Sequence, residues 1–308
     1  MFNKIFRQNI RDYKAKDLMV KNVITLSPDE NLWKAQNLMS RYNIKKIVIV
    51  KESKKKYPIG IMSLKDMIKF MISDKTDRDL HKIPITEVMT KDLIMANKNS
   101  VITGCAKTVS ENNVSSLVIV NEDDVDDSSL AGIITSTDFA NFFSENCIGL
   151  TAVENYMSRP AFTISVKEKV STAAQIMLEK KVSRLVVIDQ DNYQNNSVGI
   201  ISETDLSRTV PAFQSRTIRS VYEHIESLFS SKSKPDFITE PAFVRIQDII
   251  TANAIAINKD ADLAEAAKIM IRRNVSGLPV IEASDNIDQQ PIGIISKSDI
   301  VKALTDLE

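Results

Sequence analysis

The sequence predicts a mixed α/β protein of four tandem repeats, each with the order strand, helix, strand, strand, helix, arranged as two pairs. The first observation behind this prediction is a motif, Gly-apolar-apolar-Ser/Thr-x-x-Asp, which occurs four times and ends at Asp66, Asp138, Asp205 and Asp299. The second is that the same order of apolar and amphipathic runs precedes each copy. The third is size, because a repeat of about 60 residues has a marginal core and should pair with a neighbour.

Each copy of the motif reads as the end of a buried strand followed by the start of a helix. The hydroxyl can cap free backbone N–H groups, and the acidic residue suits the positive end of the helix dipole. The same chemistry fits a ligand, since a helix N-terminus attracts phosphate and a carboxylate accepts hydrogen bonds from ribose hydroxyls. One copy would favour a simple cap, whereas four copies in register require an explanation at the level of the repeat.

The first repeat shows the expected elements in order. A strand over residues 23–26 leads into Ser27-Pro-Asp-Glu30, which has the form of a capping box with proline at the first helical position. An amphipathic helix should follow. The continuously apolar residues 47–50 predict a strand, residues 58–62 predict the next, and Asp66 should start the closing helix.

The same order returns three more times, and a second capping box at residues 165–168 predicts the start of the helix in the third repeat. The gap between the third and fourth aspartates exceeds the other gaps by more than twenty residues, so a segment is inserted there. Its amphipathic helix over residues 218–229 could dock a partner, but we expect it to cover its own module. The expected divisions are an N-terminal segment (1–16), four repeats (17–76, 84–146, 150–210 and 245–308) and the inserted helix and loop (211–244). We expect the repeats to pair as residues 17–146 and 147–308, and the N-terminal segment to dock onto the domain that follows rather than lie on a membrane surface.

Composition excludes several classes of function. Lys plus Arg and Asp plus Glu both total 40, so the sequence predicts no basic field for nucleic acid or for a membrane. Two cysteines, Cys105 and Cys147, suggest neither a disulfide framework nor a metal cluster, and two histidines, His81 and His224, make a histidine metal site implausible. No apolar run approaches the ~20 residues that span a bilayer. We therefore expect a cytoplasmic protein with no metal and no membrane contact.

These features together resemble a known family. Repeats that begin with Met-Thr, as at Met89-Thr90, and end with Gly-apolar-apolar-Ser/Thr-x-x-Asp resemble CBS (cystathionine-beta-synthase-type) domains. Two in tandem resemble a Bateman module, and four resemble the regulatory gamma subunit of AMP-activated protein kinase and stand-alone archaeal CBS proteins. The resemblance covers residues 17 to 305. It implies pockets between paired repeats for an adenine nucleotide (AMP, ADP or ATP), and a regulatory role towards a partner protein or through self-association.

The resemblance also implies which residues line each pocket: one repeat supplies the Ser-x-Ser/Thr-Asp turn, and its partner supplies the start of the first strand and the entrance to the second. In the pocket ranked first, the residues are Ser296, Ser298 and Asp299 with Ser158, Thr163, Val182, Ser183 and Arg184. In the second, they are Thr135, Thr137 and Asp138 with Val20, Thr25, Lys45 and Lys46. In the third, they are Ser202, Thr204 and Asp205 with Thr251, Ala256, Val275 and Ser276. In the fourth, they are Ser63, Lys65 and Asp66 with Thr90, Met95, Val114 and Ser115.

The ranking follows from the charges available for phosphate. Arg184 can hold a phosphate through two hydrogen bonds, so the Asp299 pocket comes first. The Asp138 pocket has two lysines but carries Val20 where the family often has threonine. The Asp205 pocket has no cation at the strand entrance, which suits a less charged ligand, and the bulky Met95 lies at the expected base position of the Asp66 pocket.

Other functions remain open or are excluded. A ligand-free scaffold whose CBS pairs only oligomerise is the main alternative, and a sensor of S-adenosylmethionine-type ligands is another. The scaffold would not need an aspartate and a hydroxyl at all four turns. An enzyme is not expected, because the repeats use almost the whole chain and the sequence shows no Gly-rich phosphate loop or nucleophile pair. DNA binding is not expected either, because the sequence shows no recognition-helix module.

Overall fold

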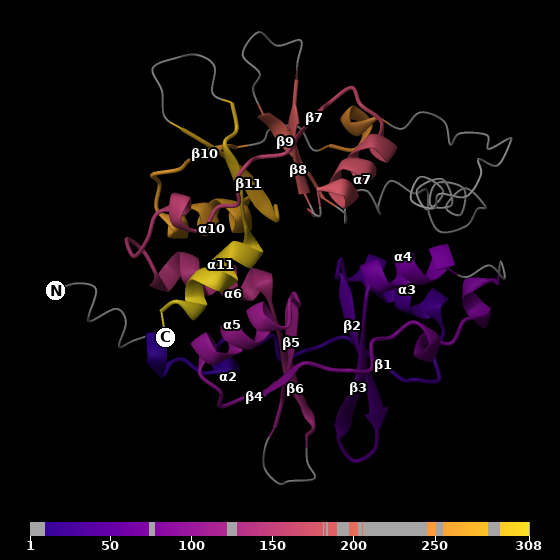
Figure 1. Ribbon diagram of the computed structural model, residues 1–308. Coiled ribbons are helices and arrows are strands. Elements are labelled where there is room, and N and C mark those ends of the chain that lie inside the picture. Colours follow the sequence, from indigo (N-terminus) through magenta and orange to yellow (C-terminus); the bar gives the residue numbers. More distant parts are fainter. Residues whose placement is uncertain are drawn as a thin grey trace, which may run out of the picture.

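The computed structural model describes residues 10–73, 78–121, 128–180, 182, 184–189, 197–202, 205, 245–250, 255–282 and 290–307. These residues form four three-stranded sheets, one in each repeat (Figure 1). In every sheet whose full pairing is described, the first strand is parallel to the second and the second is antiparallel to the third. This is the arrangement that the order strand, helix, strand, strand, helix requires, and the predicted fold class is confirmed.

The elements follow the predicted order. In the first half of the chain they are α2 (Ala15–Leu18), β1 (Thr25–Leu26), α3 (Leu32–Arg41), β2 (Lys46–Glu52), β3 (Lys56–Ser63), α4 (Leu64–Ser73), η1 (Leu80–Lys82), η2 (Ile85–Glu87), β4 (Met95–Asn97), α5 (Ile102–Glu111), β5 (Ser116–Val120), β6 (Leu130–Thr135) and α6 (Ser136–Asn146). In the second half they are η3 (Val153–Asn155), β7 (Thr163–Ser165), α7 (Val170–Glu179), β8 (Arg184–Ile188), β9 (Ser197–Ser202), η4 (Ile246–Asp248), β10 (Ile257–Asn258), α10 (Leu263–Arg272), β11 (Gly277–Ile281), β12 (Gly293–Ser296) and α11 (Lys297–Thr305).

The two predicted capping boxes are wrong. Helix α3 starts after Asn31, whose side-chain oxygen accepts a hydrogen bond from the backbone N–H of Lys34 at 3.0 Å. The preceding Ser27–Glu30 residues form a turn, because the carbonyl of Glu30 is held by the backbone N–H of Ile85 from η2 at 2.9 Å. Glu168 likewise accepts from Ile246 of η4 before α7 begins. A distant segment therefore delays each helix, which local spacing cannot reveal.

The end of the first helix in a repeat is set by a left-handed residue. Asn43, Asn113 and Asn274 have φ angles of 50°, 50° and 52° and follow α3, α5 and α10. Asparagine is among the few residues other than glycine that tolerate this conformation, so the chain can leave the helix and enter the buried second strand.

The sheets of the first two repeats face each other and share a core. Val48 and Val50 of β2 cluster with Val118 and Val120 of β5, all of them buried. Alternate residues of β2 and β5 point into this shared layer, as a strand period of two requires. The expectation that repeats 1 and 2 pair around a common core is thereby met. In the second pair, the third strand of repeat 3, β9, contacts the second strand of repeat 4, β11.

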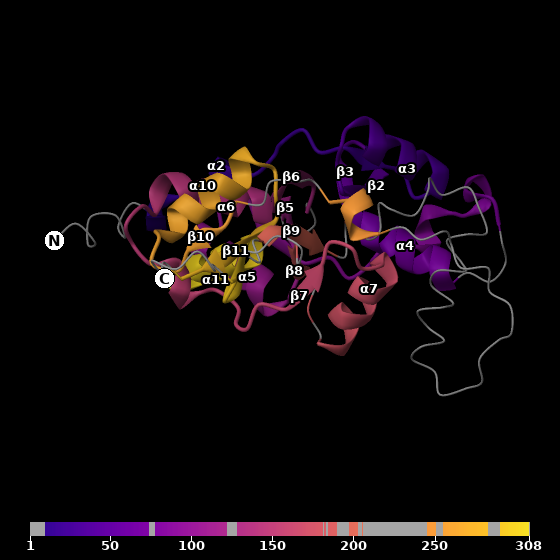
Figure 2. The same cartoon turned by 90° about the horizontal axis from the view of Figure 1, so that it is seen from above.

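The four repeats lie around a common centre, and the pairs meet through helices (Figures 1 and 2). Helices α5 and α6 of repeat 2 pack against α10 and α11 of repeat 4. The largest hydrophobic cluster joins them, with Phe139, Phe143, Leu263 and Leu304 all fully buried. By contrast, the described core residues of repeats 1 and 3 form separate clusters.

The N-terminal segment docks onto repeat 2. Ile10 belongs to the large cluster and is 1% exposed, the ring of Tyr13 packs edge-on against Phe142 with centroids 4.9 Å apart, and the Tyr13 hydroxyl donates to Asn146 at 3.2 Å. The sequence predicted that this segment docks onto the domain that follows it. The described residues of the segment contact repeat 2, the partner of repeat 1. The predicted insert helix over residues 218–229 lies outside the described residues.

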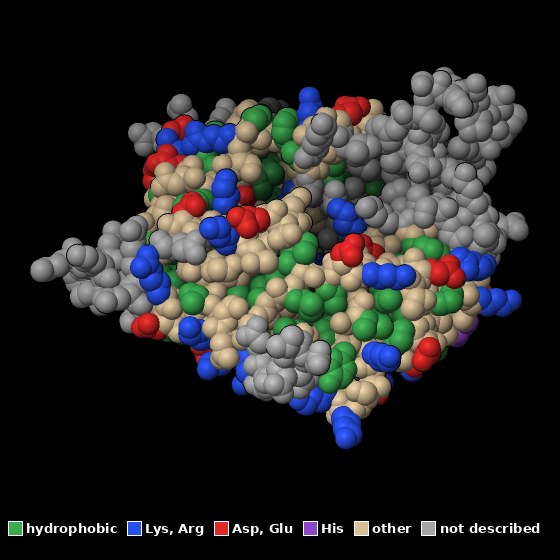
Figure 3. All heavy atoms as spheres, turned by 60° about the horizontal axis from the view of Figure 1, so that its bottom comes forward, with side chains coloured by type: hydrophobic (Ala, Val, Ile, Leu, Met, Phe, Trp, Pro, Cys, Tyr) green, Lys and Arg blue, Asp and Glu red, His purple; other side chains and the backbone are tan. Residues whose placement is uncertain are grey.

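The face shown in Figure 3 carries Lys and Arg side chains interspersed with Asp and Glu, so no single-sign patch gathers there. Among the described residues, no helix is both long and apolar enough to cross a membrane, and no group of His, Cys, Asp and Glu side chains is arranged to hold a metal ion. Cys105 and Cys147 are both free thiols in the interior.

Candidate functional site

All four motif turns have the same local geometry. In each, one carboxylate oxygen of the aspartate, Oδ2, accepts two hydrogen bonds from the Ser or Thr three residues earlier, one from its backbone N–H and one from its hydroxyl. The distances are 2.8 and 2.6 Å for Ser63 to Asp66, 2.7 and 2.7 Å for Thr135 to Asp138, 3.0 and 2.5 Å for Ser202 to Asp205, and 2.8 and 2.6 Å for Ser296 to Asp299. The helix cap read from the sequence is thus real. Among the described residues, no side chain or backbone group donates a hydrogen bond to the other oxygen, Oδ1, which leaves it able to accept from a ligand.

The start of each described partner repeat crosses the last strand of this motif. Val20 and Ile133 exchange backbone hydrogen bonds of 2.9 and 3.1 Å, as do Thr90 with Ile61 (2.8 and 3.0 Å) and Ser158 with Ile294 (2.9 and 3.0 Å). These exchanges bring Val20 beside the Asp138 turn, Thr90 beside the Asp66 turn and Ser158 beside the Asp299 turn. The fourth such residue, Thr251, lies outside the described residues.

This crossing explains the glycine in the motif. A Cβ atom added to Gly132 would lie 2.8 Å from the backbone oxygen of Val20 and 2.7 Å from the sulfur of Met19. One added to Gly293 would lie 2.7 Å from the backbone oxygen of Ser158. Real Cβ atoms do not approach a carbonyl oxygen so closely, and glycine is the residue that permits such backbone contact. The glycine therefore serves the pairing of repeats.

In repeats 1, 2 and 4, the entrance to the second strand is held at the motif turn of the same repeat. The first N–H of α4, of α6 and of α11 donates to the carbonyl of Lys45 (3.0 Å), Ser115 (3.2 Å) and Ser276 (3.1 Å), respectively. Each helix N-terminus consequently lies beside the residues that the resemblance assigns to ligand binding in the neighbouring cleft.

The cation at the start of β2 lies elsewhere than its sequence assignment. Lys46 was assigned to the Asp138 pocket, but its amino group donates to the hydroxyls of Ser115 and Ser116, each at 2.7 Å. Ser115 was assigned to the Asp66 pocket. Burial lowers the pKa of Lys46 to about 8, although the nearby Asp66 acts in the opposite direction. Lys46 therefore lies near Asp66 and contacts a residue assigned to that pocket, and its own assignment to the Asp138 pocket stays a prediction.

Arg184 occupies the equivalent place at the start of β8. Its Nε donates to the hydroxyl of Ser276 at 3.4 Å, and its charge reaches Asp299. Burial raises the pKa of Asp299 above its usual range, while the hydrogen bonds from Ser296 and the charges of Arg184 and Lys302 act against that rise. The charge of Arg184 thus acts on Asp299, while its hydrogen bond reaches Ser276, which the sequence assigned to the Asp205 pocket.

The remaining predicted residues differ in their access to solvent. Those with exposed side chains are Val20, Lys45, Lys65, Thr90, Met95, Ser115, Thr137, Ser158, Thr163, Val275 and Ser298. Those partly buried are Thr25, Val114, Val182 and Ala256, and the hydroxyl of Thr25 accepts a hydrogen bond from Lys56 at 3.1 Å. Ser183, Thr204 and Thr251 lie outside the described residues. Most of the assigned side chains can therefore be reached by a small molecule.

Three large apolar side chains are left open to solvent at these clefts. Val20, Met95 and Val275 are 46%, 43% and 37% exposed, and each had been assigned to a different pocket. Exposed apolar side chains at a cleft commonly mark a surface that a ligand covers.

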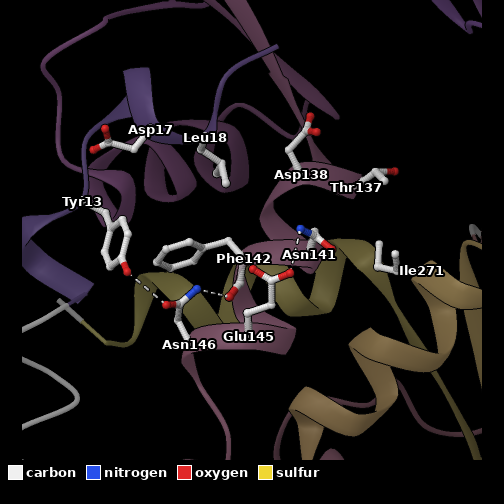
Figure 4. Close-up of a pocket in the computed structure, with 10 residues that line it drawn as sticks. All are labelled: Tyr13, Asp17, Leu18, Thr137, Asp138, Asn141, Phe142, Glu145, Asn146 and Ile271. Carbon is white, nitrogen blue, oxygen red and sulfur yellow. Dashed lines mark hydrogen bonds between the residues drawn. The ribbon is translucent and has the colours of Figure 1, made fainter.

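A cavity of about 440 Å³ opens beside the Asp138 turn, between the N-terminal segment, α6 and α10 (Figure 4). Its lining includes Asp17 and Leu18 of α2, Thr137 and Asp138 at the start of α6, and Ile271 of α10. The start of α6 is consequently accessible from a cavity that residues of both modules line.

One residue near these sites was missed by the sequence reading. Lys297 stands between Ser296 and Ser298, is only 9% exposed, and donates from its amino group to the Thr137 hydroxyl at 3.1 Å. Nothing in the repeat pattern distinguishes it from Lys65, which holds another variable position of the motif but is exposed. Only the contact between modules buries Lys297.

Comparison with known proteins matches this architecture. The sequence matches the CBS domain family at residues 15–73, 85–145, 153–212 and 246–306. The chain belongs to the CBS-domain family.

Full-length relatives come from archaea. The uncharacterized proteins MJ1404 and MJ1225 of Methanocaldococcus jannaschii are 21% and 22% identical over 96% and 92% of this chain. The chain spans 62% of the length of MJ1404 and 95% of that of MJ1225. The crystal structure of MJ1225, described as a proposed archaeal homolog of g-AMPK, has a TM-score of 0.68 at 21% identity and covers 94% of this chain and 99% of its own. An uncharacterized conserved protein from Pyrococcus horikoshii has a TM-score of 0.61 at 19% identity, covering 95% and 100%. These likenesses establish the fold.

Proposed function

We propose that this CBS protein is a non-catalytic regulatory protein that binds adenosine-containing ligands, AMP, ADP or ATP, between paired repeats and signals their presence to a partner. The observation that carries the proposal is the repeated turn in which the aspartate uses Oδ2 for its helix cap and keeps Oδ1 for a ligand. In the three clefts where the partner segment is described, that segment lies beside the turn.

The chemistry of a nucleotide fits this arrangement. The aspartate can accept hydrogen bonds from ribose hydroxyls, while the helix N-terminus and the Ser and Thr hydroxyls can donate to phosphate oxygens. Val20, Met95 and Val275 offer apolar surface for the adenine ring. A scaffold without a ligand would leave these side chains exposed without a function.

The Asp299 pocket is the best candidate for a phosphorylated ligand. Ser296 and Asp299 are fixed at the start of α11, and Arg184 provides a guanidinium that can hold phosphate through two hydrogen bonds. The Asp138 pocket follows with Lys45. In the Asp66 pocket, Lys65 stands where the motif has its second hydroxyl, and the Asp205 pocket has Ser276 at its strand entrance.

Titration calorimetry of the full chain with adenosine, AMP, ADP, ATP and S-adenosylmethionine tests the proposal. We expect Asp299→Ala to weaken AMP binding at its site by about tenfold or more, because hydrogen bonds to charged groups contribute roughly 1.5–3 kcal/mol. Arg184→Ala should weaken AMP far more than adenosine.

Asp262→Ala is the matched control. Asp262 caps α10 of the same repeat, accepting from Ala264 at 3.0 Å, but no pocket was assigned to it. Each variant loses a helix cap, which lowers stability by ~1 kcal/mol, and Asp262→Ala also loses the hydrogen bond that the Gly149 N–H donates at 2.6 Å. Only Asp299→Ala should lose affinity. If none of the five compounds binds the wild-type chain, the scaffold function replaces the sensor. Tighter binding of S-adenosylmethionine than of AMP would support the proposed class of adenosine-containing ligands, with S-adenosylmethionine rather than AMP as the ligand.

A further inference from the structure

A buried lysine of the second module holds an exposed hydroxyl of the first. Lys297 is the first residue of α11 in repeat 4 and is only 9% exposed, and its amino group donates at 3.1 Å to the hydroxyl of Thr137 in repeat 2. Thr137 lies in the first turn of α6, directly before Asp138, and is itself exposed. The hydroxyl is therefore fixed by the other module while it stays accessible to a small molecule.

The direction of this hydrogen bond decides what the hydroxyl can still do. A hydroxyl has one proton and two lone pairs, whereas an ammonium group can only donate. The bond from Lys297 therefore occupies a lone pair of the Thr137 oxygen and leaves its proton for another acceptor. In the part of the chain that the structure describes, no group accepts a hydrogen bond from this hydroxyl. Thr137 thus presents a donor beside Asp138, whose Oδ1 can accept.

The docking of the two modules keeps the lysine in place. Its backbone N–H donates to the carbonyl of Ser276 at 3.1 Å, and α11 packs against α5 and α6 of repeat 2. An ammonium group withdrawn from water is costly without a partner, so the bond from Lys297 to Thr137 should persist when a ligand arrives. The orientation of the Thr137 hydroxyl therefore depends on a residue that only the docked second module supplies.

The residues that hold the same motif position in other repeats do not act in this way. In repeat 2 this residue is Ser136, whose hydroxyl donates within its own repeat to the carbonyl of Ser115 at 3.4 Å. In repeat 1 it is Leu64, whose side chain has no hydrogen-bonding group. Of the three residues at this position that the structure describes, only Lys297 donates across to the other module.

We propose that Lys297 is a positioning residue for the Asp138 pocket, which orients the Thr137 hydroxyl so that its proton is donated to a ligand. The inference rests on the proposed function and specifies which ligand this pocket prefers. The donor lies one residue from the carboxylate that would hold ribose, so a phosphorylated adenosine, with its additional acceptor oxygens, should bind more tightly than adenosine. Lys297 acts through Thr137 and does not itself touch the ligand.

Titration calorimetry of the full chain with AMP and with adenosine tests the inference, read at the site that Asp138→Asn weakens. Lys297→Met should weaken AMP binding by about threefold to tenfold, the range for one oriented hydrogen bond, and adenosine binding by less than about twofold. Lys297→Leu, which gives repeat 4 the residue that repeat 1 has at this position, should behave alike and replaces the methionine variant if that variant does not fold. Lys297→Arg keeps a donor and should retain most of the AMP affinity. Lys268→Met removes an exposed lysine from α10 of the same repeat and should leave both affinities unchanged.

A double-mutant cycle with Thr137 separates positioning from a structural role. Thr137→Val should weaken AMP binding by about tenfold or more, and in that background Lys297→Met should cause no further loss. Thr137→Ser keeps the hydroxyl and should keep the response to Lys297→Met. A loss that persists in the Thr137→Val background, or that falls equally on AMP and adenosine, would overturn the inference, as would Lys297 variants that bind like Lys268→Met. These results leave the proposed function intact, whereas failure of the wild-type chain to bind AMP or adenosine would overturn both.

Discussion

Repeats 2 and 4 differ from repeats 1 and 3 in what their helices bury, although all four share one fold. Helix α10 buries five of its ten residues, whereas α3, in the same place in repeat 1, buries only Leu32, Ala35 and Met39. Three of the five in α10 are alanines, which allow a second helix to approach closely on the face away from the sheet. An amphipathic helix with one apolar stripe covers its own sheet, and a helix with two can also join another repeat.

The entrance to the second strand differs in the same way. Repeats 1 and 3 have Lys46 and Arg184 at the first residue of that strand, while repeats 2 and 4 have Ser116 and Gly277. Both cations donate to serines of the paired repeat. One half of the molecule therefore supplies the packing that joins the modules, and the other half supplies charge to the clefts.

The largest expected effect tests the packing half of this comparison. Phe143→Ala on α6 should lower the free energy of unfolding by about 3–5 kcal/mol, because it opens a cavity in the cluster joining repeats 2 and 4. The matched aromatic deletion in repeat 1 is Trp33→Ala. Trp33 is 43% exposed and stacks on His81 with ring centroids 4.3 Å apart, so its loss should not exceed about 1.5 kcal/mol. Urea unfolding of both variants measures how much unfolding free energy each one loses. Similar losses would contradict the distinction between repeats 2 and 4 and repeats 1 and 3.

A smaller effect separates the two kinds of contact made by repeat 2. Gly132→Ala places a Cβ against the backbone of Val20 and should destabilise the chain by about 1–3 kcal/mol. Gly104 lies within α5, where an added Cβ meets no atom within 4 Å, so Gly104→Ala should stabilise by about 0.5–1 kcal/mol. Thermal unfolding of the two variants should shift in opposite directions. Shifts of the same sign would mean that the crossing of Val20 is not what requires the glycine.

The last expected effect concerns the charged half and depends on pH. The pKa of Lys46 falls to about 8 in the folded chain from an ordinary value of 10.5. Between these values the unfolded chain holds a proton that the folded chain has lost, so stability contributed by this group rises as pH increases from 8 to 10.5. Below pH 8 both states are protonated, and the folded state bears the cost of burying the charge. Lys46→Met should lack this rise.

Melting temperatures of wild type and Lys46→Met across that pH range give the test, since other titrating groups are common to both chains. The difference between the two should shrink as pH rises. A constant difference would show that Lys46 keeps its ordinary pKa. Arg184→Met provides the contrast, because a guanidinium stays charged throughout this range and should produce no such trend.

Local features of the sequence were sufficient for the fold and for the centre of each turn. Period-two and helical spacing identified the strands and helices, and the recurring Ser/Thr and Asp residues identified four turns whose hydrogen bonds the structure contains, three of them at the starts of the described helices α4, α6 and α11. These features depend on residues a few positions apart, so a short stretch of the sequence is enough to predict them. The exception is instructive: Ser27–Glu30 has the residues of a capping box, yet a backbone bond from Ile85 holds it as a turn.

The tertiary structure decided which helices have a second buried face, which side chains Lys46 contacts and where Lys297 lies. Lys45, Lys46 and Lys297 are the same type of residue, and the sequence of a repeat does not distinguish them. They differ in the folded chain because different distant residues surround them. Ser115 and Ser116 draw Lys46 towards Asp66, and the docking of repeat 4 onto repeat 2 buries Lys297 against Thr137. Burial and charge pairing of this kind arise only when segments far apart in the chain meet, because desolvation depends on everything packed around a group and not on its neighbours in sequence.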